Sequence, residues 1–525
     1  GIPSDEYIKA VKLSAEADDA DRNNHILAIR AARFNTSTPV VPKPYIEVAT
    51  IFDAPFVAQL IDRTQSLISA EPPKLARTAI NPKVPKSLDA AELITAWFND
   101  GAYPRMAQAE DTWSMVTDSI SEGGHGIWKL HSKKHLWGKA TQPGKDEPDE
   151  DYLERTDSVR KNRWPFFMQH VPTTNFHEVA HDDDGLSEVM EISTHSKPVM
   201  YSRYEKQLRA VGKLIENDAS SLEGECELVQ YWNTNSYKYV LDDVTVDSGK
   251  HGGRRPPYYH AMFSQTGIKS SRYETSAIAD GILSPSEWVR EMVTAKGVWA
   301  KLTSFPIFVL EPISDESMPD YNKKWVIEWA AGETTVPPSG FRWRPVEFPG
   351  TGDDLNQMIS MMMQLIDQVS LAPILFGKSV GDQSGTVMHG LVQLARAIFG
   401  PCLNSISRQY DRMASEMLYL VEHEFKARVP VEQLGENKWL EIGAEEIGGY
   451  YRVSHTLKPL IAMEAMVEYQ MAADQEQRGY VDKAYVRERI PGITKPQEMA
   501  DRVVAQTVEG SPQVTQLIIA KVLEL

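Results

Sequence analysis

The residues best spaced for chemistry are two histidines and a glutamate at positions 177–181, which read His-Glu-Val-Ala-His. On a helix this spacing places both imidazoles on one face, where they can bind zinc, with the glutamate as general base. The flanking residues disfavour a helix, because Val-Pro-Thr-Thr precedes the motif and Asp-Asp-Asp-Gly follows it. A zinc-dependent hydrolase is therefore kept as an alternative, and a strand or turn with surface histidines is the preferred interpretation.

A second group of histidines alternates with lysines between positions 125 and 139. It comprises His125, His131, His135, Lys129, Lys133, Lys134 and Lys139. Three histidines could form a metal site, but the lysines favour a solvated basic strand face. The chain has no G-x-x-x-x-G-K-[ST] phosphate loop and no G-x-S-x-G nucleophile elbow. We therefore expect no enzyme activity, no catalytic residues, no cofactor and no bound metal.

Two cysteines, Cys226 and Cys402, are too few for a disulfide framework, so a reducing compartment is expected. The first falls in a predicted strand and the second in a predicted helix, each without a nearby histidine, which favours a buried structural role. No run of 18 apolar residues occurs, so no membrane span is expected.

The length of 525 residues corresponds to three or four structural units. With 55 basic and 73 acidic residues, the net charge is −18. This acidity argues against a general nucleic-acid coat, which needs a strongly basic face. It does not exclude DNA that passes through without adhering.

The first half of the chain has a mixed pattern. Helical spacing of apolar residues predicts helices at 5–34, 52–69, 89–99 and 105–121. Strand patterns occur at 126–137, where a strand pair is predicted, at 164–200, and as a hairpin of 227–232 with 237–246. The acidic, apolar-poor segment 144–157 predicts a surface loop.

The second half is more clearly organised. A capping box at Ser284-Pro285-Ser286-Glu287 predicts a helix to about Leu302. Short strands are predicted at 307–310, 325–329 and 341–348, followed by a helix at 353–371. A polar loop at 377–385 contains three glycines. A long helix at 386–425, kinked at Gly400-Pro401, comes next, then strands at 437–455 and helical segments at 458–525.

Two further patterns of this half each have a structural and a functional interpretation. The stripe Met358, Met361, Met362 and Met363 is typical of an adaptable core or of subunit packing. Four cations, Lys323, Lys324, Arg342 and Arg344, share a small strand unit with Trp325, Trp329 and Trp343. That unit is either an exposed strand face or a contact for nucleic acid or a protein partner.

The order helix, small strand module, helix, glycine-rich loop, long helix resembles the portal proteins of tailed bacteriophages. The resemblance rests on segments that occur in the expected order between 280 and 425. They are Arg342-Trp-Arg-Pro-Val-Glu-Phe-Pro-Gly, Gly352-Asp-Asp-Leu-Asn-Gln-Met-Ile, Leu371-Ala-Pro-Ile-Leu-Phe-Gly, Gln383-Ser-Gly and Gly400-Pro401. Segments at 163–167, 227–232 and 254–258 fit more loosely.

The resemblance implies an α+β portal-like fold. It assigns 1–280 to a mixed α/β wing, 281–303 and 350–372 to two stem helices, and 304–349 to a small β-rich clip. Residues 373–386 become the tunnel loop, 387–455 the long kinked wing helix with the rest of the wing, and 456–525 a C-terminal helical crown.

In function, the resemblance implies a ring of about twelve identical subunits at one capsid vertex. Double-stranded DNA enters through its channel, driven by the terminase large subunit, and leaves by the same route at ejection. Further implied partners are the head–tail adaptor and the major capsid and scaffolding proteins. The implied location is the virion, with the host cytoplasm as the place of assembly.

The resemblance also implies functional residues. The tunnel loop supplies Lys378, Ser379, Val380, Asp382, Gln383, Ser384 and Thr386, which face the DNA. The clip, facing terminase or adaptor, supplies Lys323, Lys324, Trp325, Arg342 and Arg344. A net negative ring would let a duplex slide rather than bind. Besides the zinc hydrolase, a virion adaptor that forms no ring is the other alternative.

Overall fold

The computed structural model describes residues 2–36, 51–70, 72–108, 111–137, 148–183, 185–212, 223–268, 273–304, 308–313, 340–345, 353–369, 397–433, 438–457, 472–479 and 486. They form both helices and antiparallel sheets, so the predicted α+β class is confirmed. The chain divides into two units. Unit 1 comprises Gly1–Ile26, Ile61–Ile278 and Leu371–Leu525, and unit 2 comprises Leu27–Leu60 and Ala279–Ser370.

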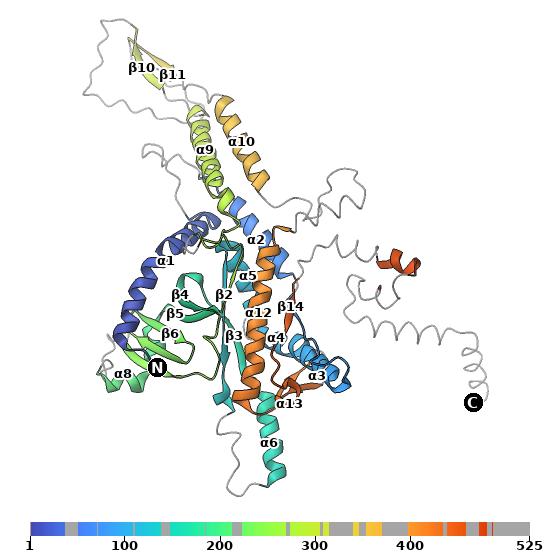
Figure 1. Ribbon diagram of the computed structural model, residues 1–525. Coiled ribbons are helices and arrows are strands. Elements are labelled where there is room, and N and C mark those ends of the chain that lie inside the picture. The colour runs from blue at the N-terminus through green and yellow to red at the C-terminus, as the bar shows by residue number, and fades with distance from the viewer. Residues whose placement is uncertain are drawn as a thin grey trace, which may run out of the picture. The chain divides into compact units, whose positions relative to one another are not determined.

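The larger sheet of unit 1 has five antiparallel strands in the order β4-β5-β6-β7-β8 (Figure 1). They are β4 (Phe176–Asp182), β5 (Gly185–Ser196), β6 (Glu225–Asn233), β7 (Ser236–Leu241) and β8 (Val244–Lys250). Successive side chains of a strand point to opposite faces. In β6, Leu228 therefore packs with α7 (Lys197–Arg203) and α8 (Glu205–Ala210), whereas Val229 packs with Ile8 of α1 (Asp5–Arg33).

The predicted hairpin around residues 233–236 is confirmed, because Trp232 pairs with Tyr237 across β6 and β7. Its second arm was predicted as one strand and is in fact two. The chain reverses at Asp242 and Asp243, whose φ angles are 44° and 69°. Aspartate tolerates this left-handed region better than most residues, so the reversal carries no glycine signal.

The second sheet of unit 1 has three antiparallel strands in the order β3-β2-β9. They are β2 (His125–Ser132), β3 (Phe166–His170) and β9 (Tyr258–Met262). Residues 126–137, predicted as a strand pair, form β2 and a single 3₁₀ turn at Lys134–Leu136. A buried cluster of Ile127, Val189 and Tyr258 packs this sheet against the larger one.

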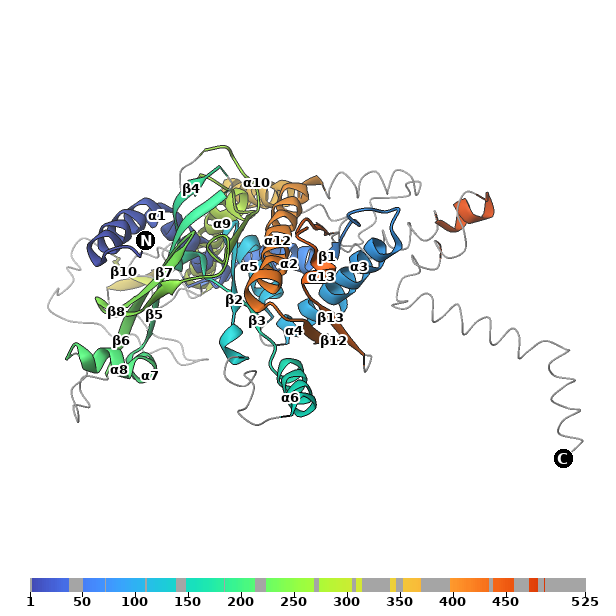
Figure 2. The same cartoon turned by 60° about the horizontal axis from the view of Figure 1, so that its bottom comes forward.

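Two helices cover the three-stranded sheet, α5 (Thr112–Gly123) and α12 (Gly400–Leu420) (Figure 2). The indole nitrogen of Trp128 in β2 donates to the sulfur of Met413 in α12 over 3.3 Å. The helix predicted at 386–425 therefore exists from Gly400 onward, with Pro401 in its first turn and a π-helical end at Val421–Phe425. Two turn residues precede Gly400, and 386–396 lie outside the described residues.

The remaining described strands of unit 1 form two antiparallel pairs, of which only the first joins distant parts of the sequence. Strand β1 (Lys74–Ala76) pairs with β14 (Ser454–Thr456), and β12 (Val429–Glu432) pairs with β13 (Trp439–Ile442). The other described helices of unit 1 are α3 (Pro85–Ala96), a π-helical segment at Trp97–Ala102, α4 (Tyr103–Ala107), α6 (Asp149–Asn162) and α13 (Ala444–Ile447). Helix α2 (Phe56–Ser69) begins in unit 2 and continues into unit 1 from Ile61. The helices predicted at 52–69, 89–99 and 105–121 are thus confirmed with shifted ends, and the last of them is split in two.

The prediction of a surface loop at 144–157 is wrong from residue 149 onward, because α6 begins there. Acidic side chains at a helix start interact favourably with its dipole, and Asp157 forms an i,i+4 ion pair with Lys161 at 2.6 Å. Thr156 is buried on this helix. The segment has few apolar residues because this helix buries little of its surface, and for that reason the sequence pattern did not predict a helix.

The Gly101→Ala substitution is expected to lower the free energy of unfolding by about 1–3 kcal/mol. A Cβ at Gly101 would overlap the side chain of Val431, a buried, β-branched residue of β12 that has few other rotamers. Urea titration measures the change. The control is Gly400→Ala, where no neighbour lies within 4 Å and the helical position favours alanine. Equal stability of the two variants would contradict the overlap.

Besides the end of α1 and the start of α2, the described part of unit 2 contains two helices and a strand pair. They are α9 (Asp280–Ser304), β10 (Phe308–Pro312), β11 (Phe341–Pro345) and α10 (Asp353–Val369). The helix predicted from Ser284 starts at Asp280, because Ile282 and Leu283 already donate to the carbonyl of Ala279. Pro285 therefore lies inside the helix rather than at its first position.

Candidate functional site

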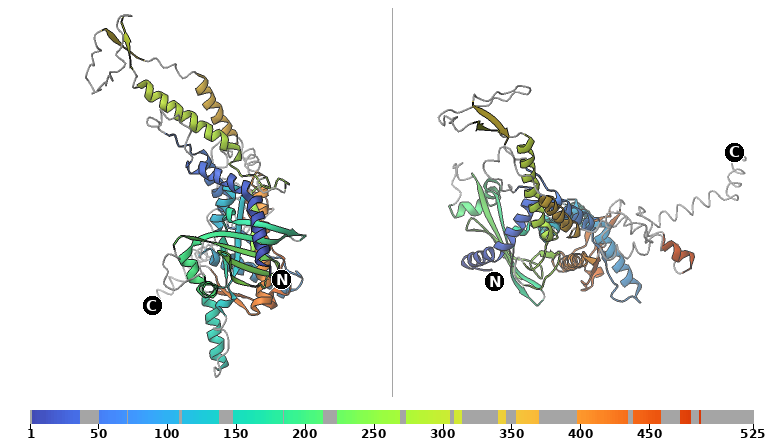
Figure 3. Two further views of the ribbon diagram at one scale, coloured as in Figure 1. Left: turned by 90° about the vertical axis from the view of Figure 1, so that its left-hand side faces the viewer. Right: turned by 90° about the horizontal axis from the view of Figure 1, so that it is seen from above.

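Helices α9 and α10 lie side by side and run in opposite directions (Figure 3). Late in α9, the Lys296 ammonium donates to the Asn356 side-chain oxygen, early in α10, over 2.7 Å. Early in α9, Gly281 lies against the side chain of Val369 at the end of α10, where a Cβ would not fit. These two contacts, at opposite ends, fix an antiparallel helical hairpin.

Buried apolar side chains form the inner side of the hairpin. Val289 and Met292 of α9 and Ile366 of α10 are buried. The segment before α2 is fixed to the same helix, since the Phe52 N–H donates to the Thr294 hydroxyl over 3.1 Å and Arg290 donates to the Phe52 carbonyl over 3.3 Å. Unit 2 therefore has a small core of its own.

Helix α10 also carries an apolar face that the hairpin leaves exposed. Met358, Met361 and Leu365 follow the i, i+3, i+7 spacing of one helix face and are 40%, 51% and 39% exposed. We call these three residues the α10 apolar face. A contiguous exposed apolar surface is typical of a protein contact. The predicted methionine stripe thus divides, with Met362 and Met363 half-buried and Met358 and Met361 exposed.

The strand pair between the helices places opposite charges together. Glu311 of β10 lies opposite Arg342 of β11 and accepts hydrogen bonds from Arg342 over 2.8 Å and from Arg344 over 3.4 Å. Both arginines are largely exposed. The hydrogen bond from Arg342, together with the charges of both arginines, lowers the pKa of Glu311. These three side chains, one carboxylate and two guanidinium groups, together carry a net positive charge.

Most residues predicted for the clip and the tunnel loop lie outside the described residues. Arg342 and Arg344 are described, and the structure brings them together on Glu311. Lys323, Lys324 and Trp325 lie outside it, as do Lys378, Ser379, Val380, Asp382, Gln383, Ser384 and Thr386. The crown predicted at 456–525 is described only at 456–457, 472–479 and 486.

The His-Glu-Val-Ala-His segment is strand β4, which contradicts the helical zinc site. His177 is buried and bonds through Nδ1 to Asp19 at 2.7 Å, so the surface interpretation is wrong for it and right for exposed His181. Glu178 bonds instead to His181 at 2.8 Å and His260 at 2.6 Å. In the part of the chain that is described, no group of three or more His, Cys, Asp or Glu side chains could hold a metal ion.

Neighbouring histidines keep the Glu178 carboxylate charged although it is largely buried. Burial raises its pKa, but the charge of His260 and the hydrogen bonds from His181 and His260 outweigh this and hold the pKa well below the usual value. His260 also bonds to His125 at 2.9 Å, with the two rings stacked. The cluster is a connected polar network in which each member has a partner.

The interpretation of 125–139 as a solvated basic strand face is wrong for β2. Lys129 and His125 are almost fully buried there, and only the end of the strand is exposed. The Lys129 ammonium donates to Gln230 over 2.7 Å and to Glu191 over 3.3 Å. Glu191 lies 62 residues and Gln230 101 residues further along the chain, so no local pattern in the sequence reveals them.

Stability is expected to fall by about 2 kcal/mol between pH 7 and pH 5 through His131 alone. Burial, reinforced by the charge of Lys129, lowers the pKa of His131 to about 4, from 6.5 in the unfolded chain. Below pH 6.5 the imidazole is therefore protonated in the unfolded state but not in the native state, and the free energy of unfolding decreases until about pH 4. Urea titrations of the native chain and of His131→Gln measure it. An identical pH slope in both would contradict this assignment.

Both cysteines are buried, as predicted, Cys226 in β6 and Cys402 in α12. Burial raises the pKa of both thiols, which keeps them protonated and unreactive at neutral pH. Within the described ranges, no helix is both long enough and apolar enough to cross a membrane.

The structure is similar to chains of gene transfer agent (GTA) particles. Two of these chains belong to the neck of a particle. The chain from the neck of the empty particle, computed with C6 symmetry, is 12% identical, with a TM-score of 0.36, and the match covers 87% of this chain and 97% of the neck chain. The neck of the native particle, computed with C12 symmetry, has 12% identity and a TM-score of 0.37 over 88% and 98%. A chain of the native virion has 11% identity and a TM-score of 0.35 over 88% and 98%. No protein-family model and no curated protein matches the sequence significantly.

Proposed function

We propose that the chain is a portal subunit. Copies of it close into a ring, with about twelve members expected, at one vertex of a capsid. The ring is the channel through which terminase packages DNA and through which DNA leaves, and it is the attachment point of the head–tail adaptor. Capsid and scaffolding proteins are the partners during assembly in the host cytoplasm.

The observation that carries this proposal is the α10 apolar face. Met358, Met361 and Leu365 lie on one side of a helix whose other side already has its partner in α9. In a head-to-tail ring, a patch on one subunit meets a different patch on the next. Methionine side chains suit such a contact because they adapt to neighbours that shift.

The order of elements in unit 2 supports the same proposal. A helix, a two-stranded antiparallel sheet and a second helix follow one another, as the stem–clip–stem assignment requires. The exposed arginine pair on β11 is then placed to meet terminase or adaptor. Helix α12 would be the later part of the long wing helix.

Charge supports a conduit rather than a DNA-binding coat. Each subunit has a net charge of −18, and a ring multiplies this charge. Phosphates adhere to surfaces rich in lysine and arginine, and release from them depends on salt. An acidic ring with few cations at its narrowest point would let the duplex slide.

Deleting 380–384, the middle of the proposed tunnel loop, is expected to leave ring assembly intact and to reduce DNA packaging or retention strongly. On this proposal the loop narrows the channel, and the fold of the subunit does not depend on it. Nuclease-protected DNA in procapsids that carry the variant measures the effect, and a deletion of equal length at 141–145 is the control. Loss of folding, or normal packaging by intact rings, would overturn the tunnel assignment.

The alternative of a non-ring adaptor makes a different prediction for the purified chain. An adaptor stays a monomer or dimer under conditions in which a portal closes into rings. If the chain is an adaptor, a procapsid that lacks it should still package DNA, because an adaptor acts only after the head is full.

A further inference from the structure

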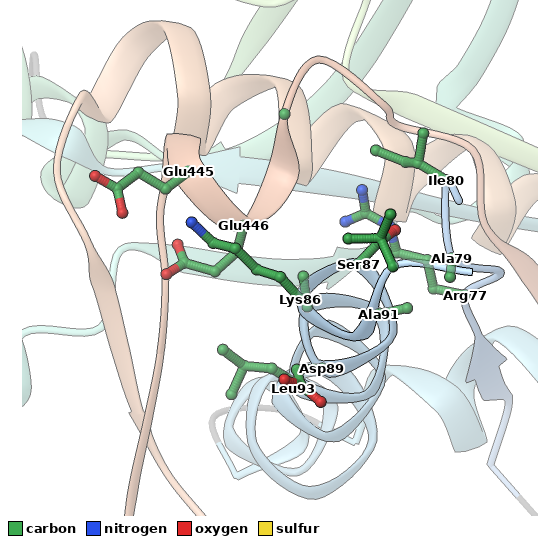
Figure 4. Close-up of a pocket in the computed structure, with 13 residues that line it drawn as sticks. Arg77, Ala79, Ile80, Lys86, Ser87, Asp89, Ala91, Leu93, Glu445 and Glu446 are labelled. Atoms are coloured by element: carbon green, nitrogen blue, oxygen red, sulfur yellow. The ribbon is translucent and has the colours of Figure 1, made fainter. Parts of the chain in front are cut away.

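A cavity of about 430 Å³ lies in unit 1 between the first turn of α3 and the turn that follows α13 (Figure 4). Its walls include Ile80, Val84 and Leu93, and its cations are Arg77 and Lys86. The other polar residues that line it are Ser87, Asp89, Glu445 and Glu446. This volume lies within the range of small-ligand pockets, which combine apolar walls with a few placed polar groups.

Arg77 is the buried polar group of this cavity. It is 9% exposed, and its Nη2 donates to the carbonyl oxygens of Ile447 over 2.9 Å and Tyr450 over 2.7 Å. These bonds and the contact with the Tyr450 ring fix the guanidinium group. Its Nη1 is buried and has no hydrogen-bond partner. Figure 4 shows the guanidinium beside Ile80 and Ser87, which line the same cavity.

An unpaired buried donor on a charged group is rare and energetically costly. The two carbonyl bonds explain why Arg77 stays folded inward, and they use only one of its terminal nitrogens. The second, Nη1, is therefore a fixed, charged donor that has no acceptor in the described part of the chain. An anionic oxygen is the acceptor that binds such a group best.

The start of α3 adds a second, independent preference for an anion. Its N-cap residue, Val84, provides no side-chain cap, and Pro85 has no N–H, so the positive end of this twelve-residue helix is uncompensated. Lys86, in the same turn, is exposed and has no carboxylate partner among the described residues. Arg77, Lys86 and the helix start therefore act on one volume.

The other residues of the cavity limit which anion fits. Ile80 and Val84 line the cavity with 58% and 43% of their surface exposed, so an aliphatic group that covers them would be favourable. Glu446 pairs with Arg428 at 2.5 Å and Glu445 pairs with the same guanidinium at 4.0 Å, whereas Asp89 remains as a negative group that disfavours a doubly charged phosphate. A single carboxylate attached to an aliphatic body satisfies both conditions.

We propose that this cavity binds an acidic side chain of a partner polypeptide, with aliphatic residues of the same segment covering Ile80 and Val84. The carboxylate accepts from Arg77 Nη1 and lies near Lys86 and the α3 start. A polypeptide is favoured over a free small carboxylate because the exposed apolar residues extend the binding surface beyond the cavity. Binding here needs no ring.

The test uses the full chain and two blocked peptides, acetyl-Ala-Leu-Glu-Leu-Ala-amide and the same peptide with glutamine in place of glutamate. Hexanoate serves as the small carboxylate. Ligand-observed NMR titration gives the dissociation constants. We expect the glutamate peptide to bind at least about tenfold more tightly than the glutamine peptide, which is the fold-change expected for one charge-assisted hydrogen bond.

Variants separate the parts of the site. Lys86→Met and Ile80→Ser alter only exposed positions and are expected to weaken the glutamate peptide about three- to tenfold. Arg77→Lys, which keeps the charge but loses the second nitrogen, is expected to weaken it about tenfold. Lys83→Met is the matched control, because Lys83 is a nearby exposed lysine that does not line the cavity.

Three results would overturn the proposal. Equal binding of the two peptides would exclude carboxylate recognition. Equal loss in Lys83→Met and Lys86→Met would show a nonspecific charge effect. Hexanoate binding as tightly as the glutamate peptide would assign the cavity to a small molecule instead of a polypeptide.

Discussion

Replacing Lys129 with methionine is expected to lower the free energy of unfolding by about 3–5 kcal/mol. The side chain is 1% exposed, and its ammonium lies between the carboxylate of Glu191 and the amide of Gln230. It also lies over the rings of Tyr258 at 4.6 Å and Trp232 at 5.2 Å. Removing the cation leaves the buried Glu191 carboxylate without its counter-ion, which costs more than the lost contacts.

Urea titration followed by tryptophan fluorescence measures this loss. The double variant Lys129→Met/Glu191→Gln is expected to recover at least half of it, because no unpaired charge remains and Tyr258 still has a hydrogen-bond acceptor at this position. Lys134→Met is the control. Its ammonium is exposed and only loosely paired with Glu424, so its loss should cost less than about 0.5 kcal/mol.

A destabilisation below about 1 kcal/mol in Lys129→Met would contradict the buried ion pair. A double variant that is less stable than Lys129→Met would also contradict it, because the loss would then come from packing and not from the unpaired charge. The two outcomes are distinguishable, since only the second leaves Lys129→Met strongly destabilised.

The Met361→Asp substitution is expected to abolish self-association of the chain without unfolding it. Met361 is 51% exposed in the single subunit, so an aspartate there stays hydrated and the fold is unaffected. At an interface between subunits the same carboxylate loses its water without gaining a partner. That cost is on the order of 3–5 kcal/mol per contact, which weakens each contact more than about hundredfold.

Size-exclusion chromatography with light scattering, at micromolar concentration, measures the association, and circular dichroism checks the fold. Ser360→Asp is the matched control. It introduces the same charge on an exposed position of α10 that points away from Met358, Met361 and Leu365. Assemblies of unchanged size in Met361→Asp, or dissociation in both variants, would remove the α10 apolar face from the interface.

Local signals in the sequence predicted the elements of unit 2 well. Apolar residues at helical spacing and the residues around positions 349–353 predicted α10 to start at Asp353, as it does. The capping signal at Ser284 predicted α9 but placed its start too late, because a preceding turn at Ala279 already continues into the helix. Such short-range patterns act within a few residues, so they can be read from one sequence.

The polar interior of unit 1 could not be read in this way. Lys129 and His125 looked like exposed cations because their partners, Glu191 and His260, come from other strands. Arg77 is fixed by carbonyl groups 370 and 373 residues further along the chain. Which charges are buried depends on which strands pair, and that pairing is decided by contacts across the whole chain.

The measurement that tests the central claim most directly is the mass and shape of the purified full chain. Mass photometry and negative-stain electron microscopy of one sample are expected to show rings with a central hole and a mass of about 700 kDa, or twelve subunits of 59.0 kDa. A 59.0 kDa species that remains monomeric, also when co-expressed with capsid and scaffolding proteins, would contradict the portal proposal.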